Sequence, residues 1–479
     1  MLSRVSSYVC CAAVLAMLVW SFFTSPARAG TIDSLGVDSS VNLLVLENIN
    51  ASNSDVEGNV VVGGNATLNN YSINQYGTGT GLTVGGNLNF SSGNINGNAL
   101  TGGDASIANA YIDGYTSTVG NLNFANGTIN GNATTGGNAT INSTYVDGYA
   151  STVGNLNFSS GTINGNALTG GNASISNSYV NGNTSTGGNL NFADGTIMGN
   201  TISGGNATIA STYIAGVTST GGNLNLSNGT LNGNVITGKN ATISSSSVNG
   251  NTSTGGVLKV TDATLAKVAA PSTPLTPTNP IAPTSPLLNV ATESARLLNL
   301  SDSIESASQN GTYALIGGNT LSLTVSGPVS VFDISADELS KVTVMSIADP
   351  ANFNDNDTLI FNILGSDVSF GAIDMSSLAS DENNILFNMN QATELTLQSG
   401  IYGSLLAPLA TVLDDDGKGG VIDGQVIVNN WDSSVQVNDP SYTGNLPVAS
   451  TPEPGTMLLM CVGLLGTVFV RLRKMKHAY

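Results

Sequence analysis

A four-residue block, Asn-Leu-Asn-Phe, recurs through the middle of the chain at a constant spacing. It begins at Asn87, Asn121, Asn155 and Asn189, and it returns as Asn-Leu-Asn-Leu at Asn223. Each copy lies 34 residues after the previous one, without insertion or deletion. Every unit divides into two similar halves of 17 residues, so ten halves run from residue 87 to residue 256. A fixed period of constant length predicts a stacked array, because each repeat must fit onto the one before it.

The pattern inside one half predicts its local structure. Apolar residues stand at positions 2, 4 and 9, as in Leu156, Phe158 and Ile163, and position 11 is always glycine. Positions 2 and 4 share one face of a strand because successive side chains alternate. We expect the glycines at positions 11, 16 and 17 to allow tight corners. The predicted fold is therefore all-β, a narrow parallel β-solenoid of 17-residue coils (a 34-residue double repeat), about 4.8 Å per coil and roughly 48 Å for ten coils.

The composition argues against several classes of function. Only 9% of the residues are charged and the formal net charge is −19, which disfavours nucleic acid as a partner. The three cysteines lie in apolar terminal segments, and the single histidine is His477. A body without His or Cys lacks the common nucleophile–base pairs and His-ligated zinc. We expect a protein that is not an enzyme and has no cofactor; a carboxylate-based glycan hydrolase or lyase remains the catalytic alternative.

Residues 1–29 have the order of a secretory signal peptide. A basic residue near the start precedes a mainly apolar stretch, and Ala27-Arg28-Ala29 supplies small residues for cleavage. The alternative is an uncleaved membrane anchor.

Residues 451–479 have the order of a second targeting signal. Pro452-Glu453-Pro454 precedes a mainly apolar stretch over 456–470 and then a basic cluster, an order that suits a short membrane-spanning helix with a cytoplasmic tail. The segment resembles the PEP-CTERM sorting signal of Gram-negative bacteria. The resemblance implies an exosortase as processing partner, transient anchoring in the inner membrane through this segment alone, and export to the cell surface or extracellular matrix. A plain C-terminal anchor is the alternative.

The chain changes character after the array. In residues 267–286 a proline falls at every third position from Pro271 to Pro286, which predicts a polyproline II spacer; a peptide-docking site is the alternative. Residues 287–310 carry an amphipathic helical pattern, with Ser294 and Ser301 as polar breaks in its apolar stripe. Short alternating strands separated by turn clusters follow over 311–446.

Repeated polar residues are the candidate binding groups. A Thr-Ser-Thr triplet recurs, and its hydroxyls suit a row that faces ice or a polysaccharide, with solvated turns as the alternative; the candidate ligand-facing residues are Thr116, Thr118, Thr184, Thr186, Thr218, Thr220, Thr252 and Thr254. Asparagines such as Asn121 and Asn155 recur in register and suit amide ladders, turns or a ligand array. The acidic loops 354–357 and 414–417 carry oxygen ligands of the kind that Ca²⁺ prefers, although neither has EF-hand spacing.

The segment Ser39–Ile73 resembles the opening of the choice-of-anchor A family, through Ser54-Asp55-Val56-Glu57-Gly58 and Val62-Gly63-Gly64-Asn65. The family's closing half matches Val331-Phe332-Asp333-Ile334, 403–408 and 424–428. The resemblance implies one β-solenoid with a helix alongside, formed jointly by residues 30–86, the coil repeats 87–266 and residues 311–446. It also implies a secreted, non-catalytic structural or adhesive protein of the cell surface or biofilm matrix. The alternative is a solenoid that binds ice or polysaccharide through its Thr/Ser rows.

Overall fold

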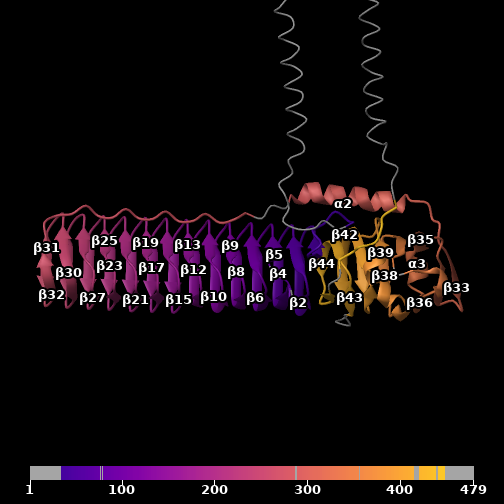
Figure 1. The fold of residues 1–479 in the computed structure, drawn as a ribbon, viewed down its shortest axis with the longest axis horizontal. Coiled ribbons are helices and arrows are strands. Elements are labelled where there is room, and N and C mark those ends of the chain that lie inside the picture. The colour runs from indigo at the N-terminus through magenta and orange to yellow at the C-terminus, as the bar shows by residue number, and fades with distance from the viewer. Residues whose placement is uncertain are drawn as a thin grey trace, which may run out of the picture.

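The computed structural model describes residues 34–75, 77, 79–285, 289–354, 356–414, 420–438 and 441–447. The predicted signal peptide (1–29) and sorting segment (451–479), with Ala27, Ala29, Pro452, Glu453 and Pro454, lie outside these residues. The described chain forms a straight rod of stacked parallel strands, as Figure 1 shows. The predicted parallel β-solenoid is confirmed.

Each coil contributes three short strand segments to three rows that run along the rod. Strands pair in parallel with a register step of 17 residues, as Leu156 with Ala173. The first coils hold one eight-residue strand across two rows: β2 (Ile49–Val56), β4 (Ala66–Ile73), β6 (Leu88–Ile95), β8 (Ala105–Ile112), β10 (Leu122–Ile129) and β12 (Ala139–Val146).

Later coils divide that strand in two. The first-row strands are β14 (Leu156–Ser159), β17 (Ala173–Ser176), β20 (Leu190–Ala193), β23 (Ala207–Ala210), β26 (Leu224–Ser227), β29 (Ala241–Ser244) and β31 (Leu258–Thr261). The second-row strands are β15 (Thr162–Ile163), β18 (Tyr179–Val180), β21 (Thr196–Ile197), β24 (Tyr213–Ile214), β27 (Thr230–Leu231), β30 (Ser247–Thr254) and β32 (Thr264–Val268).

The third row contains the Thr-Ser-Thr triplets. Its strands are β1 (Val41–Val45), β3 (Asn59–Val62), β5 (Thr80–Val84), β7 (Asn98–Thr101), β9 (Thr116–Thr118), β11 (Ala133–Thr135), β13 (Ala150–Thr152), β16 (Ala167–Thr169), β19 (Thr184–Thr186), β22 (Thr201–Ser203), β25 (Thr218–Thr220) and β28 (Val235–Thr237). The end of β30 completes the row by pairing with β28.

The two flanks of the array meet in one stack. Strand β1 lies between β3 and β44 (Val426–Asp432), so the first and last parts of the described chain are neighbours. The stack continues from β44 through β42 (Ser404–Asp414), β39 (Ile385–Asn388), β37 (Thr358–Leu364) and β35 (Val329–Ser335). Shorter strands fill its other rows: β38 (Asp367–Phe370), β40 (Glu394–Leu397), β41 (Ile401–Tyr402), β43 (Val421–Asp423) and β45 (Gln436–Asn438). Figure 1 shows the array on one side of this junction and the C-terminal strands on the other.

The core of the array alternates between two kinds of coil. One coil places Leu156 and Phe158 inside, and the next places Ala173 and Ile175 there, all at most 3% exposed. The bulky phenylalanine is accommodated by a glycine three residues later, because a Cβ on Gly161 would lie 2.9 Å from the Phe158 ring. Large and small side chains therefore share a narrow interior at close-packed density.

Each coil has a left-handed residue at position 6, whereas among the array glycines at positions 11, 16 and 17 only Gly97 has a positive φ. Position 6 has φ between +47° and +57° in every coil from Asn53 to Asp262, and it always carries Asn, Ser or Asp. Asn and Asp tolerate this conformation better than other residues that carry a Cβ. Most glycines at positions 11, 16 and 17 do lie in bends, as predicted, but what requires glycine there is mainly the close approach of the next coil. A Cβ on Gly182 would lie 2.5 Å from the carbonyl oxygen of Gly165, so this glycine is required for close stacking of coils.

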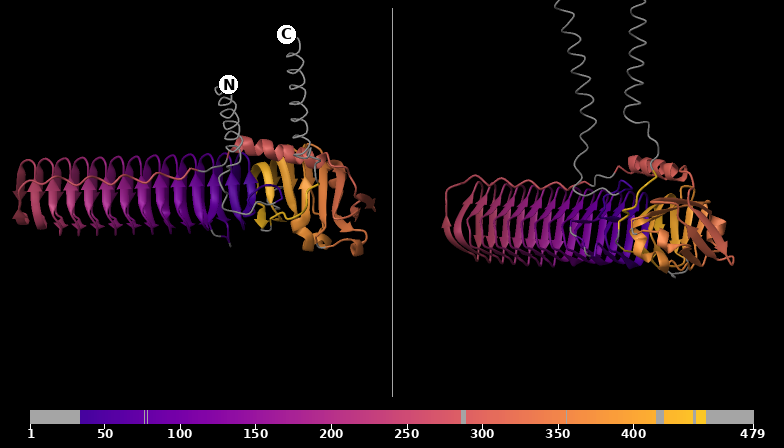
Figure 2. Two further views of the ribbon diagram at one scale, coloured as in Figure 1. Left: turned by 45° about the horizontal axis from the view of Figure 1, so that its top comes forward. Right: turned by 45° about the vertical axis from the view of Figure 1, so that its right-hand side comes forward.

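From the far end of the array the chain returns along the outside of the rod. Residues 270–285, called the strap below, have no regular hydrogen-bonded secondary structure and run back toward α2 (Val290–Glu305), as both views in Figure 2 show. Helix α2 lies within the predicted range 287–310 and packs against β42 and β39. The helix ends at Glu305, and the chain then joins the sheet, where the Asn310 side chain bonds the backbone of β35.

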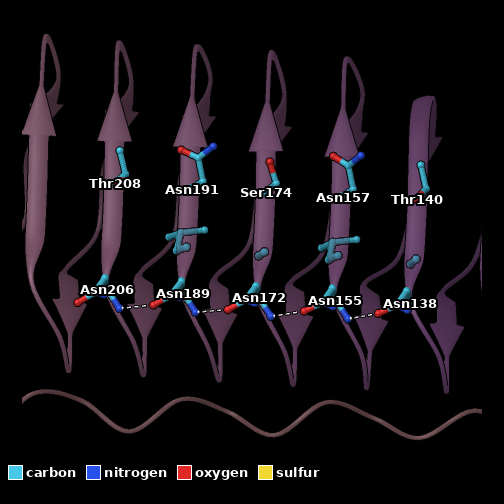
Figure 3. A pocket seen from close by; sticks show the side chains of 14 residues that line it. Asn138, Thr140, Asn155, Asn157, Asn172, Ser174, Asn189, Asn191, Asn206 and Thr208 are labelled. Atoms are coloured by element: carbon cyan, nitrogen blue, oxygen red, sulfur yellow. Dashed lines mark hydrogen bonds between the residues drawn. The ribbon is translucent and has the colours of Figure 1, made fainter.

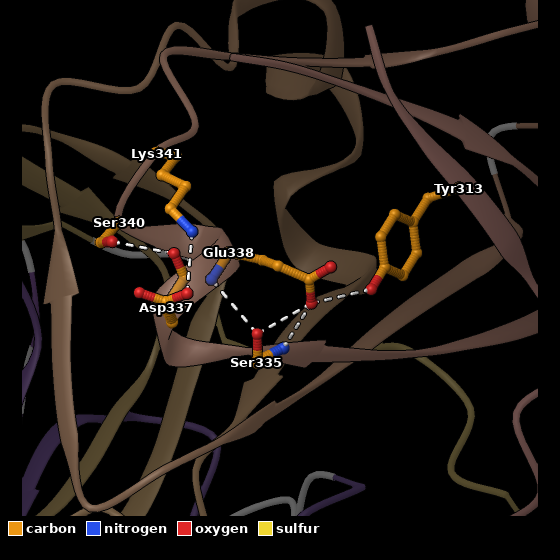
Figure 4. Close-up of polar contacts among 6 residues, drawn as sticks. All are labelled: Tyr313, Ser335, Asp337, Glu338, Ser340 and Lys341. Carbon is orange, nitrogen blue, oxygen red and sulfur yellow. Dashed lines mark hydrogen bonds and ion pairs between the residues drawn. The ribbon is translucent and has the colours of Figure 1, made fainter. Parts of the chain in front are cut away.

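A small mixed sheet closes the C-terminal end of the rod. It contains β33 (Thr312–Ile316), β34 (Thr320–Thr324) and β36 (Val344–Ile347). The short helix α3 (Ala336–Leu339) follows β35 and begins with a capping box between Ser335 and Glu338. The Tyr313 hydroxyl donates to the Glu338 carboxylate at 3.2 Å, and Lys341 pairs with Asp337 at 2.8 Å (Figure 4). Short 3₁₀ helices span Pro350–Asn352 and Ser376–Asn384.

Candidate adhesive surface

The predicted ligand-facing threonines point into the rod. Seven of them are at most 1% exposed: Thr116, Thr118, Thr184, Thr186, Thr218, Thr220 and Thr252. Thr254, in the last complete coil, is partly exposed, and its hydroxyl donates to the carbonyl oxygen of Lys239. In a three-residue strand the first and third side chains share one face, and here that face is the core. The prediction that these threonines face a ligand is therefore wrong.

The serine between each pair of threonines points outward but does not meet solvent. Ser117, Ser185 and Ser219 are at most 1% exposed because the strap lies over them. This face of the rod is occupied by the protein's own chain. An external ligand must use one of the other faces.

The repeated asparagines form ladders along the rod, which was one of the roles predicted for them. The Oδ1 atom of Asn138 accepts the backbone N–H of Asn155 at 2.8 Å, and Asn155 accepts that of Asn172 at 2.8 Å. Figure 3 shows the ladder as a row along the rod. Each asparagine carbonyl is thereby used to join successive coils, whereas the residues themselves remain exposed.

Two shallow grooves run along the first row of strands beside this ladder. One of about 580 Å³ is lined by residues from Asn138 to Thr208, and one of about 710 Å³ by residues from Asn65 to Thr140. Their outward side chains alternate between Asn and Thr or Ser, as in Thr140, Asn157 and Ser174. Amide and hydroxyl groups in such rows both donate and accept hydrogen bonds.

A row of tyrosines follows the second row of strands. Tyr111, Tyr145 and Tyr179 are 38–39% exposed, and Tyr213 is half-buried. Each lies two coils from the next, a separation of about 9.6 Å along the rod. Tyr179 lines a shallow groove of about 570 Å³ together with Thr162 and Thr196 of the neighbouring coils. The 34-residue spacing of these tyrosines is visible in the sequence, but no motif there marks them as a row on one face.

Hydrogen bonds hold the tyrosine rings against the surface. The Tyr145 hydroxyl donates to Asp147 at 2.9 Å and accepts from the Asn164 amide of the next coil at 2.6 Å. The hydrogen bond to Asp147 raises the pKa of Tyr145, and hydrogen bonds from Asn164 and Tyr145 lower the pKa of Asp147. At neutral pH the hydroxyl is therefore protonated and the carboxylate is charged, which is the pairing that the geometry requires.

The array surface carries few charges. Between residues 87 and 256 the charged residues are Asp104, Asp113, Asp147, Asp194 and Lys239. The net charge of −19 therefore resides mainly in the rest of the chain. The tyrosine and asparagine faces present mainly aromatic, amide and hydroxyl groups, with isolated carboxylates at Asp104, Asp113 and Asp147. They therefore suit an uncharged partner better than a polyanion.

The acidic loops are described in part. Asp357 accepts hydrogen bonds from the backbone and side chain of Asn354, and Asp414 accepts one from the Ser434 backbone. Asp355 and residues 415–419 lie outside the described residues. Within the described part of the chain no group of three or more His, Cys, Asp or Glu residues is arranged to hold a metal ion. Calcium binding at these loops stays a prediction.

A family model described as "Putative Ice-binding-like adhesive domain" matches residues 34–121 and 150–439, on both sides of the junction and along most of the array. The chain belongs to this family. A second model, the PEP-CTERM protein-sorting motif, matches residues 450–474. The predicted family, with an adhesive-type body and a PEP-CTERM ending, is confirmed. The protein is accordingly an exported surface protein of structural or adhesive type, and its sorting motif implies processing by exosortase-type machinery.

Solved structures similar to the ice-binding-like adhesive chain are distant. The C-terminal domain of a tapirin from Caldicellulosiruptor hydrothermalis has 14% identity and a TM-score of 0.22, covering 88% of this chain and 93% of its own. An ice binding protein from an Antarctic bacterium, Flavobacteriaceae, has 13% identity and a TM-score of 0.16, covering 89% and 100%. Likeness at this level carries no argument about function. No curated protein matches the chain.

The predicted membrane-spanning stretch 456–470 lies outside the described residues. Among the helices that are described, none is both long enough and apolar enough to cross a membrane.

Proposed function

We propose that this protein is a non-catalytic adhesive rod that binds an uncharged extracellular polysaccharide through its tyrosine row. The row of four tyrosines at two-coil spacing is the observation that carries the proposal, and the hydroxyls of Tyr111, Tyr145 and Tyr213 each accept a hydrogen bond from an asparagine of the next coil. A flat aromatic ring presents an apolar face against which the C–H face of a sugar ring packs. In a β-linked glycan the same face recurs at every second sugar, and two extended sugar units are close in length to two coils.

The neighbouring polar rows support the same partner. The Asn and Thr or Ser side chains of the first strand row offer donors and acceptors to sugar hydroxyls along the length of the rod. Many weak contacts repeated along a polymer add up to firm attachment, because each contact raises the local concentration for the next. The near-neutral array imposes no charge requirement on the glycan.

The test is binding of the protein to insoluble uncharged polysaccharides, cellulose and chitin, by co-sedimentation. We expect the double variant Tyr145→Ala/Tyr179→Ala to bind at least about tenfold more weakly, since each aromatic contact contributes about 1 kcal/mol. Tyr145→Phe/Tyr179→Phe should retain most of the binding because the rings remain. Equal binding by the wild type and the alanine variant would show that the tyrosine row is not the binding surface.

Val153→Ala is the matched control, because Val153 is 44% exposed but belongs to a different position of the coil. It should bind as the wild type does. Ice is a second candidate ligand, since the family description names it. Thermal hysteresis measured on the same variants separates the two: activity that is lost in Tyr145→Ala/Tyr179→Ala without any glycan binding would assign the row to ice.

We propose that the chain is sorted in a Gram-negative bacterium, held transiently in the inner membrane by residues 456–470 and processed by an exosortase at Pro452-Glu453-Pro454. The match of the PEP-CTERM motif to residues 450–474 supports this order of events. The non-catalytic role is supported by a body without His or Cys between the two terminal segments.

A further inference from the structure

The strap is held by a regular set of side-chain contacts. Backbone N–H groups of Leu275, Thr278, Ile281 and Thr284 donate to the hydroxyl oxygens of Ser219, Ser185, Ser151 and Ser117, at 2.8, 2.7, 2.7 and 2.6 Å. Three of the serine hydroxyls donate in return to the carbonyl oxygen of the same strap residue, as Ser117 does to Thr284 at 2.9 Å. One serine therefore serves both backbone groups of one strap residue. A polyproline II helix makes no internal hydrogen bonds, so these groups are free to be bound.

The prolines of the strap occupy a second set of positions. Pro274, Pro277, Pro280 and Pro283 are half-buried, whereas the other described residues from Ala270 to Ser285 are exposed. The four rings lie over Gly238, Gly204, Gly170 and Gly136, where an added Cβ would approach the ring to 3.3–3.4 Å. Val119 and Val153 occupy the equivalent position in coils that carry no proline, and they are 38% and 44% exposed.

The two periods match in length. Three residues of polyproline II rise about 9.3 Å, and two coils rise about 9.6 Å. The third strand row follows the same alternation. Serine stands in the middle of every second triplet, while Thr134, Leu168, Ile202 and Ile236 take that place in the coils between.

We infer that this face of the solenoid is a binding site for a polyproline II helix, with one serine and one glycine for each proline triplet, and that its occupant is residues 270–285 of the same chain. The inference is independent of the proposed function, since the tyrosine and asparagine rows lie on other faces. Every 34-residue unit covered by the strap then requires one strap triplet. The number of covered units and the number of strap triplets must therefore change together.

Hydrogen exchange measured by mass spectrometry on the full chain tests the serine contacts. In Ser185→Ala the strap loses the acceptor for the Thr278 amide, and we expect one strap amide to exchange about tenfold faster. Ser174→Ala removes an exposed hydroxyl of the first strand row and should leave strap exchange unchanged. Unchanged exchange in Ser185→Ala would overturn the inference.

Matched deletions test whether one strap triplet is needed for each 34-residue unit. Removing residues 172–205 shortens the array by two coils, and removing 277–279 shortens the strap by one triplet, each in phase with its own repeat. The variant with both deletions should keep protected amides at Leu275 and Ile281 and should melt at a higher temperature than either single deletion. With 277–279 alone removed, the strap is about 9.3 Å short and must release at least one serine. The inference of one strap triplet for each 34-residue unit would be wrong if both single-deletion variants had the same strap protection and the same melting temperature as the double-deletion variant.

Discussion

At the scale of the residue, the direction of a side chain decides its role more than its type does. Within one Thr-Ser-Thr triplet the threonines fill the core and the serine holds the strap. The interior hydroxyl of Thr218 has no hydrogen-bond partner among the described residues. Its neighbour in the next coil is Val235, which fills the same space with a methyl group in place of the hydroxyl.

This comparison predicts that Thr218→Val stabilises the rod. Burying a hydroxyl without a partner is unfavourable, and valine has nearly the same shape, so the free energy of unfolding should rise by about 1 kcal/mol. Chemical denaturation followed by circular dichroism measures the change. Thr208→Val, at an exposed position of the first strand row, should have little effect. A fall in stability for Thr218→Val would show that its hydroxyl is satisfied.

At the scale of the element, helix α2 is joined to the sheet by a buried polar chain. The Ser301 hydroxyl donates to Asn388 at 2.5 Å, the Asn388 amide donates to Asn362 at 3.0 Å, and Asn362 donates to Asp333 at 2.9 Å. Ser301, which interrupts the apolar stripe in sequence, is completely buried at this contact. Around the chain of hydrogen bonds, Leu297 and Ile304 pack against Ile360 and Leu386 of the sheet.

Asn388→Ala should therefore lower the free energy of unfolding of the C-terminal part by about 2 kcal/mol, because it leaves buried groups of Ser301 and Asn362 without partners. Asn390→Ala is the control: Asn390 also bonds α2, through Asp302 and Glu305, but at the partly exposed edge of the contact. In urea unfolding, the fall in the free energy of unfolding for Asn390→Ala should be less than half of that for Asn388→Ala. Equal effects would mean that the buried chain contributes no more than a surface contact.

At the scale of the whole molecule, both ends of the described chain lie beside α2 at the junction of the two halves. The Arg296 guanidinium donates to the carbonyl oxygen of Leu35 at 2.8 Å, and Leu446 packs against the apolar cluster that contains Leu297. The array thus projects away from the points where the terminal segments join the body (Figure 1). Lys259 and Lys267 lie on β31 and β32, the final strands at the open end, where charges oppose pairing with another sheet edge.

Sorting at the C-terminus leads to a prediction about the mature protein. We expect cleavage near Pro452–Gly455 to remove the apolar stretch and the basic tail, while the body keeps residues up to Leu446, which pack beside α2. Mass spectrometry of the exported protein should find a C-terminus in this region and an N-terminus at Gly30. Pro452→Ala/Glu453→Ala/Pro454→Ala should accumulate with the full C-terminus. An exported wild-type protein that still ends at Tyr479 would contradict processing.

The repeat by itself determined the fold class, the coil length and the identity of the core positions. A 17-residue spacing without insertions allows few structures other than stacked coils, and residues such as Phe158 and Ile163 occur at intervals that place them together inside. The C-terminal sorting motif and the helix over most of its length are likewise readable from local pattern, because each depends on residues that are close in sequence.

Only the tertiary structure decided which polar rows are available to a partner. The outward serines are covered by a segment that lies 167 residues further along the chain at Ser117 and 93 residues further at Ser185. The same contact turns the predicted spacer into a bound strap. Alternation along one strand shows that Thr and Ser point to opposite sides, but it does not show which side faces the core or what covers the other. Those outcomes depend on how the coil closes and where the chain returns, and distant contacts set both.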